Sequence, residues 1–157
     1  MIEPTALMRM AIDKCREGIA AGQSPFGCAI ALGERVLAVE HNSVWASCDV
    51  TAHAEIVALR SACRAQGSFL LPGAVAAATC EPCPMCMAAL HWARVQTVYY
   101  GATIADAAAA GFNELRFPAA ELLRQGGSGV QLVPGLLADE CRGLFELWRT
   151  TGRCEAY

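Results

Sequence analysis

Apolar and polar residues follow two different spacings along this chain, and the two spacings alternate. Apolar side chains recur every three or four residues along 5–21, which predicts a helix that ends at Gly22. Continuous apolar stretches such as 74–79 are shorter and predict buried strands. By these criteria we expect strands at 26–32, 36–40, 74–79, 96–101 and 130–133, and helices at 5–21, 51–65, 84–93, 118–124 and 137–150.

This order of elements predicts the fold class. Strands that alternate with helices form α/β domains of three layers (α/β/α), in which helices cover both faces of a sheet. The first two strands are joined at Gly33 and Glu34 as a hairpin, so they run antiparallel and the five-stranded sheet is mixed. Segment 106–117 mixes Ala with Gly, and we expect a loop there. No linker or repeat divides the chain, so we expect one domain over 1–157.

Composition narrows the class of protein. The chain is 55% hydrophobic and 17% charged with a net charge of −3, so we expect a globular protein without the clustered Lys and Arg of a nucleic-acid-binding surface. No apolar run reaches the ~18 residues of a membrane span. Met1 leads into an amphipathic segment with no signal-peptide pattern, and the cysteine count of 9 is odd, so a reducing cytoplasm is the expected location.

Two short motifs carry the candidate chemistry, His53-Ala54-Glu55 and Pro82-Cys83-Pro84-Met85-Cys86. One imidazole and two thiolates are common zinc ligands, and three protein ligands leave a fourth position for water, as in catalytic sites. Glu55 then lies beside that water as a general acid and base. We therefore expect one Zn²⁺ per chain held by His53, Cys83 and Cys86, with Glu55 as the catalytic residue. The two motifs in this order are typical of zinc-dependent nucleobase deaminases.

The predicted fold brings the two motifs together. Each lies at the start of a helix, and Thr51 is expected to cap the first of these helices. Cys83 and Cys86 are three residues apart and so lie on one face. Two junctions between strands and helices then converge at one end of the sheet, where α/β proteins place their sites.

Nearly the whole chain resembles the cytidine-deaminase superfamily in its purine branch, and bacterial guanine deaminases most of all. The resemblance rests on Pro25-Phe26-Gly27, Asn42, Thr51-Ala52-His53-Ala54-Glu55, Cys80-Glu81-Pro82-Cys83-Pro84-Met85-Cys86, Trp92-Ala93-Arg94, the segment from Ala107 to Phe112, and Glu155-Ala156-Tyr157. It implies a small-molecule purine substrate, with guanine hydrolysed to xanthine and ammonia. It also implies a homodimer that exchanges its C-terminal segments, here about 150–157, so that a terminal Tyr covers the partner's pocket.

The resemblance also implies residues that bind the base. Asn42 would hold the polar edge of a purine, although its position also fits a turn after a strand. Phe26 and Trp92 would sandwich the flat ring, and a core position is equally open for Trp92. Glu114 stands where the family usually has Asp, and would accept the amino and imino N–H groups of guanine. Tyr157 would close the pocket, while a frayed terminus is the ordinary alternative.

Three other functions stay open at this point. A tRNA adenosine deaminase shares both motifs but should carry a basic face and tail, whereas 150–157 holds one Arg. Guanosine or an aminotriazine could replace guanine, because the sequence does not give the depth of the pocket. A zinc-binding interaction module would need a fourth protein ligand, for which Cys80 and His91 are the nearby candidates.

Overall fold

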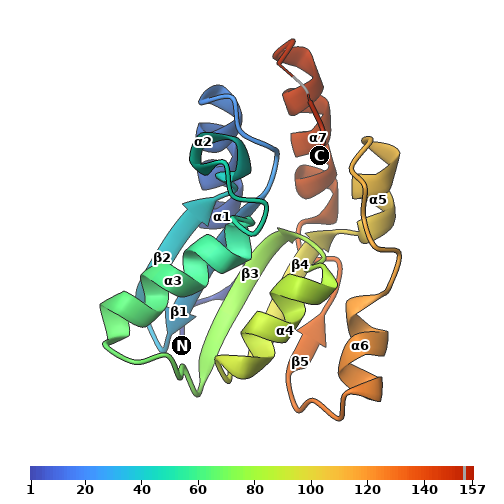
Figure 1. Ribbon diagram of the computed structural model, residues 1–157. Helices are drawn as coiled ribbons and strands as arrows, with labels where there is room; N and C mark the ends of the chain where they lie inside the picture. Colours follow the sequence, from blue (N-terminus) through green and yellow to red (C-terminus); the bar gives the residue numbers. More distant parts are fainter. Residues whose placement is uncertain (154) are drawn as a thin grey trace.

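The computed structural model describes residues 1–153 and 155–157 of the chain, so one position of the predicted C-terminal segment lies outside the described residues. Figure 1 shows a sheet with helices on both of its faces. The elements are α1 (Pro4–Ala20), β1 (Gly27–Leu32), β2 (Arg35–His41), α2 (Val44–Ser47), α3 (Ala54–Gln66), β3 (Ala74–Cys80), α4 (Pro84–Trp92), β4 (Thr97–Ala102), α5 (Ile104–Ala109), α6 (Ala119–Gln125), β5 (Gln131–Val133) and α7 (Ala138–Thr150).

The five strands form one mixed sheet in the order β2-β1-β3-β4-β5. β1 runs antiparallel to both β2 and β3, while β3, β4 and β5 are parallel. The antiparallel pair β1–β2 is the hairpin predicted at Gly33 and Glu34, and each parallel pair is connected through helices. The predicted mixed sheet is therefore confirmed.

Two apolar cores lie on opposite faces of the sheet. Successive strand residues point to opposite faces. Ala29 and Ala31 accordingly belong to the core beneath α1 and α7, whereas Cys28 and Ile30 belong to the core beneath α3, α4 and α6. Every residue of the central strand β3 is buried, as expected for a strand covered on both faces. The three-layer α/β/α architecture predicted from the sequence is thus confirmed.

The start of α3 differs from the prediction in a way that matters for the site. Thr51 was expected to cap this helix, but the cap position is occupied by His53 and the helix begins at Ala54. Both the backbone N–H and the hydroxyl of Thr51 donate to the Asp49 carboxylate, at 2.8 and 2.7 Å. This turn holds Thr51 outside the helix, because its side chain is already committed to Asp49.

The segment predicted as a loop at 106–117 is partly helical. Helix α5 begins after Thr103, whose side chain accepts from the Asp106 backbone N–H while the Asp106 carboxylate accepts from the Thr103 backbone N–H. Such a reciprocal capping box stabilises the start of a helix and outweighs the mixed composition that favoured a loop. The short helix α2 was also not predicted. Across the described residues, no helix combines the length and the apolar character needed to cross a membrane.

Candidate metal centre and active site

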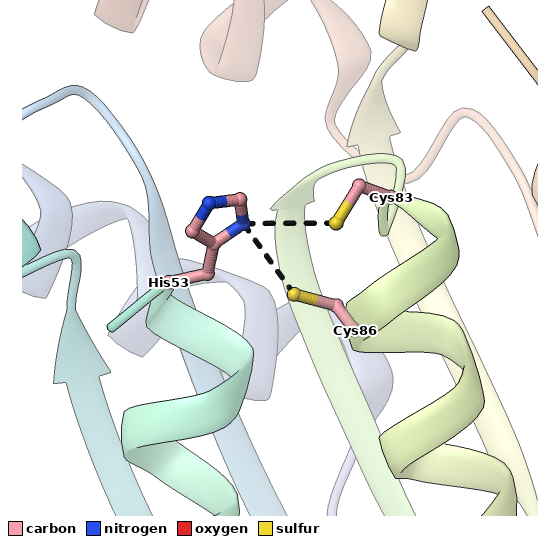
Figure 2. A group of neighbouring side chains, drawn as sticks. All are labelled: His53, Cys83 and Cys86. Atoms are coloured by element: carbon pink, nitrogen blue, oxygen red, sulfur yellow. Dashed lines mark hydrogen bonds between the residues drawn. The ribbon is translucent and has the colours of Figure 1, made fainter. Parts of the chain in front are cut away.

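The two helices that carry the sequence motifs begin side by side at one end of the sheet (Figure 2). His53 is the N-cap of α3 and Cys83 is the N-cap of α4, and neither side chain caps its own helix. Pro84 follows Cys83 in the first turn, where its missing N–H costs no helical hydrogen bond. Cys86 lies in the same turn, three residues after Cys83. Two cap residues and one residue of a first turn therefore face one another.

The ligand atoms are spaced as a zinc ion requires. His53 Nδ1 lies 3.7 Å from Cys83 Sγ and 3.6 Å from Cys86 Sγ, and all three ligand atoms lie within 4.8 Å of one another. A tetrahedral ion with Zn–N near 2.05 Å and Zn–S near 2.3 Å places nitrogen and sulfur about 3.6 Å apart. The three side chains therefore fit zinc in both donor type and spacing.

A fourth protein ligand does not complete this cluster among residues 1–153 and 155–157. The Cys80 thiol donates to the backbone oxygen of Thr103 at 3.4 Å, and His91 pairs with the Ser128 hydroxyl at 2.8 Å. Both candidates for a closed structural site thus have other partners. An open set of three ligands is the arrangement of catalytic zinc sites.

Burial shapes the acid–base properties of the site. Glu55 lies in the first turn of α3 and is only 8% exposed. Burial, with a smaller effect of the nearby Cys83 thiolate, raises the pKa of Glu55 to about 7. A carboxyl group with this pKa can both accept and release a proton near neutral pH. The hydrogen bond from Cys86 lowers the pKa of Cys83 to about 4, which favours the thiolate form that binds metal.

A small pocket next to the ligands collects most of the predicted substrate residues. Phe26, Glu55, Glu114 and Tyr157 line it together with the ligands His53 and Cys83, and Cys80 and Glu81 complete its wall. Burial, followed by the charge of Cys83, raises the pKa of Glu114 above its usual value. The carboxyl groups of Glu55 and Glu114 therefore face the same space.

Asn42 is connected to this pocket by a hydrogen bond to Tyr157. Its side chain is fully buried, and its Nδ2 donates to the Tyr157 hydroxyl at 2.5 Å while its Oδ1 accepts from the Val44 N–H at 3.1 Å. The C-terminal Tyr thus lies in the site of its own chain and occupies the amide expected to bind a base. The remaining cavity of about 20 Å³ is close to the size of one water molecule, so a base requires this ring to move.

The aromatic walls of the pocket differ from the expectation. The Tyr157 ring lies 5.7 Å from the His53 ring and 5.5 Å from the Phe112 ring, centroid to centroid. Phe26 packs edge-on against Phe112 at 4.9 Å. Phe112 was not singled out from the sequence, although it ends one of the stretches that resemble the family. The Tyr157 ring is thus tilted against His53 and meets Phe112 edge-on.

Trp92 does not join this site. It is the last residue of α4, is 69% exposed, and lies with Ile56 and Phe69 in a surface hollow over α3 and α4. Trp92 is the ninth residue of α4, eight residues beyond the first, which is a rise of about 12 Å. Phe26, by contrast, lines the pocket and packs against both cores. The structure therefore does not form the expected sandwich of Phe26 and Trp92.

Comparison with known proteins agrees with this geometry. The model of the cytidine and deoxycytidylate deaminase zinc-binding region matches residues 1–102, which include both motifs. The chain belongs to this family. It is accordingly a hydrolytic nucleobase deaminase with a zinc-binding site, and its relatives place it in the purine branch.

Two kinds of purine deaminase are similar in sequence to this chain, to almost the same degree. Guanine deaminase of Bacillus subtilis is 42% identical over 108 residues, which cover 68% of this chain and 69% of the relative. The tRNA-specific adenosine deaminase of Agrobacterium fabrum is 43% identical over 102 residues, 65% of this chain and 67% of the relative. The structure of guanine deaminase from Nitrosomonas europaea superimposes with a TM-score of 0.86 at 27% identity, covering 96% of this chain and 86% of that one. Sequence identity alone therefore does not decide whether the substrate is guanine or an adenosine in tRNA.

Proposed function

We propose that this deaminase hydrolyses guanine to xanthine and ammonia. The observation that carries the proposal is the position of Glu114, whose carboxyl group lines the same small pocket as Glu55 and the ligands His53 and Cys83. A carboxylate accepts but does not donate, so it matches the adjacent amino and imino N–H groups of guanine. Adenine presents an acceptor at the matching ring nitrogen and would leave the carboxylate partly unpaired. The guanine deaminases among the relatives support the same substrate.

The residues of the chain have separate tasks in this reaction. His53, Cys83 and Cys86 would hold one zinc ion per chain, which when bound supplies water that is acidic enough to act as a nucleophile near neutral pH. Glu55 takes a proton from the attacking water and passes it to the ring nitrogen. It then carries the second proton to the departing amino group, which leaves as ammonia rather than as an amide anion.

Other residues orient the base for this proton transfer. Asn42 offers both a donor and an acceptor to its polar edge once Tyr157 has moved. His53 and Phe112 both contact the Tyr157 ring that now fills the pocket, so they lie next to the base once Tyr157 has moved. Phe26 lines the pocket itself and packs edge-on against Phe112. In this proposal Trp92 has no contact with the base.

A screen of ammonia release tests the substrate directly. Purified, zinc-loaded protein is offered guanine, guanosine, adenine, adenosine, cytosine and the aminotriazine ammeline at equal concentrations. We expect guanine to be hydrolysed far faster than the others. Faster release from guanosine or ammeline would move the proposal to those substrates, and release only from a tRNA anticodon stem-loop would replace it.

A tRNA adenosine deaminase is the second candidate, because one relative of that kind is 43% identical. Such an enzyme needs positive charge free to contact phosphates. Six of the 11 arginines in the sequence lie within 4.0 Å of a carboxylate among the described residues, which reduces the positive charge available to phosphates: Arg9, Arg16, Arg60, Arg124, Arg142 and Arg149. Glu114 in the pocket would also repel a phosphate backbone. We therefore favour the free base.

We also propose a homodimer in which the C-terminal segment, about 150–157, crosses to the partner. Gly152 has φ +67°, so the chain turns sharply after α7. Beyond it, Tyr157 is held by Asn42 and by the Asn113 N–H, which donates to its backbone oxygen at 3.1 Å. These contacts are with the same chain in a monomer, and would be made with a second copy if the turn at Gly152 opened.

A further inference from the structure

The carboxyl group of Glu81 joins the starts of two different helices. Its Oε2 accepts the backbone N–H of Ile104 at 3.2 Å, and its Oε1 accepts the backbone N–H of Ala119 at 2.9 Å. Ile104 is the first residue of α5 and Ala119 is the first residue of α6. The N–H groups of a first helical turn have no acceptor within the helix, so Glu81 satisfies one in each helix.

Glu81 itself belongs to the loop that carries the metal ligands. It lies between β3 and α4, two residues before Cys83, and its backbone N–H donates to Ala102 at 2.8 Å beside the end of β4. It forms part of the wall of the catalytic pocket and also of a neighbouring cavity of about 570 Å³ bounded by α5, Arg116 and Pro118. The backbone of Glu81 is therefore tied to the sheet while its side chain reaches outwards.

The segment between the two helices holds Glu114. Residues 110–118 connect α5 to α6 without regular secondary structure. Both helices bounding this segment are bonded at their first residue to one carboxyl group. Glu81 therefore connects the ligand loop to both helices between which Glu114 lies.

From this arrangement we propose that Glu81 is a positioning residue that places Glu114 at the distance from Cys83 that guanine requires. Glu81 acts through Glu114 and need not touch the base. The inference rests on the proposed function, because it takes Glu114 to be the group that recognises guanine. It predicts that a change at Glu81 weakens binding of the base while the metal ligands keep their zinc.

The test measures guanine binding rather than turnover, in a Glu55→Gln background in which bound guanine is not consumed. Isothermal titration of the zinc-loaded protein gives Kd for guanine with and without Glu81→Gln. The Gln amide has one oxygen, which can still accept from the start of α5 or of α6. Its NH2 group faces the N–H of the other helix start, so one charged hydrogen bond is lost. We expect Kd to rise about tenfold, the size of such a bond, with unchanged zinc content. Glu140→Gln, a surface carboxyl paired with Arg9, is the matched control and should change Kd less than twofold.

A double-mutant cycle separates positioning from a general loss of structure. If Glu81 acts through Glu114, Glu81→Gln should have no further effect on Kd in a Glu114→Ala protein. Equal weakening in both backgrounds would overturn the inference, as would an unchanged Kd in Glu81→Gln alone. If Glu81→Gln does not fold, Glu81→Asp takes its place, because the shorter arm keeps the charge but cannot span both helix starts. A parent protein that binds no guanine at all would instead reject the proposed function, so the two failures are distinguishable.

Discussion

The metal side and the substrate side of this site are built in different ways. The metal side uses the caps and first turns of α3 and α4, which bring His53, Cys83 and Cys86 together over the sheet. The substrate side uses connecting segments: Asn42 follows β2, Glu114 lies between α5 and α6, and Tyr157 is the last residue. The metal ligands are thus held by regular elements, whereas the residues proposed to recognise the base lie in connecting segments and at Tyr157.

This difference explains why relatives with different substrates share one metal site. Ligands on helix starts are fixed by the backbone of the core, and a change there removes the reaction. Loops tolerate substitution, so the group facing the base can change while the ligands stay. The similarity to a guanine deaminase and to a tRNA adenosine deaminase, at 42% and 43% identity, fits a shared metal side with divergent recognition.

The largest effect should follow removal of a metal ligand. Cys83→Ala or Cys86→Ala leaves two protein ligands, too few for a catalytic zinc site, so zinc should fall from about one ion per chain to none. Activity should be lost with it. Metal analysis after dialysis measures the content, and Cys63→Ala on the outer part of α3 should keep its zinc. Stoichiometric zinc in Cys83→Ala would show that the metal side lies elsewhere.

Replacement of the proton shuttle should separate chemistry from metal binding. Glu55→Gln keeps the size of the side chain but cannot take a proton, so we expect turnover to fall by at least ~10²-fold with zinc retained. Steady-state ammonia release and metal analysis give the two values. Glu34→Gln, in the exposed turn between β1 and β2, should behave as the parent protein. Normal turnover by Glu55→Gln would refute the assigned role.

A smaller effect, confined to recognition, is expected on the substrate side. Glu114→Ala leaves the amino and imino groups of guanine without their acceptor, at a cost of about 1–3 kcal/mol per group. We expect a higher KM for guanine and unchanged zinc. Glu114→Asp keeps the carboxylate, and so should lie between the parent and the Ala variant. Loss of zinc in Glu114→Ala would mean that the two sides of the site are not separable.

The difference between the metal side and the substrate side also explains which features could be predicted from the sequence. Periodicity located β1 to β5 and the longer helices, and the spacing of the cysteines identified one face of α4, because these depend on neighbours in the chain. Phe112 and Glu81 were missed as parts of the site, since their roles depend on how α5, α6 and the C-terminus meet the ligand loop. Trp92 was placed at the site because an aromatic ring can stack on a flat base, but it lies at the far end of α4 and on the outer surface. Local spacing thus predicted the metal side better than the substrate side.

The smallest effect expected concerns the C-terminal residues. Deletion of 153–157 removes Tyr157 and its contacts with Asn42 and Asn113, but leaves the three zinc ligands in place. We expect activity to fall several-fold with zinc retained, because Tyr157, once it has moved aside for the base, would still cover the pocket, exclude water and strengthen the electrostatic interactions within it. Tyr157→Phe, which loses only the hydroxyl, should fall less. A truncated protein as active as the parent would show that the tail has no part in catalysis.

Mixed dimers determine which chain the tail serves. A Glu55→Gln chain and a chain lacking 153–157 are unfolded and refolded together, and the heterodimers are isolated by two different affinity tags. If tails are exchanged, the truncated chain keeps its own Glu55 and receives Tyr157 from its neighbour, so one site per heterodimer should regain the parent rate. If each tail closes its own site, as within the single chain described here, both sites stay impaired. Heterodimers no more active than the truncated homodimer would therefore reject the exchange and leave Tyr157 as a cover for its own chain.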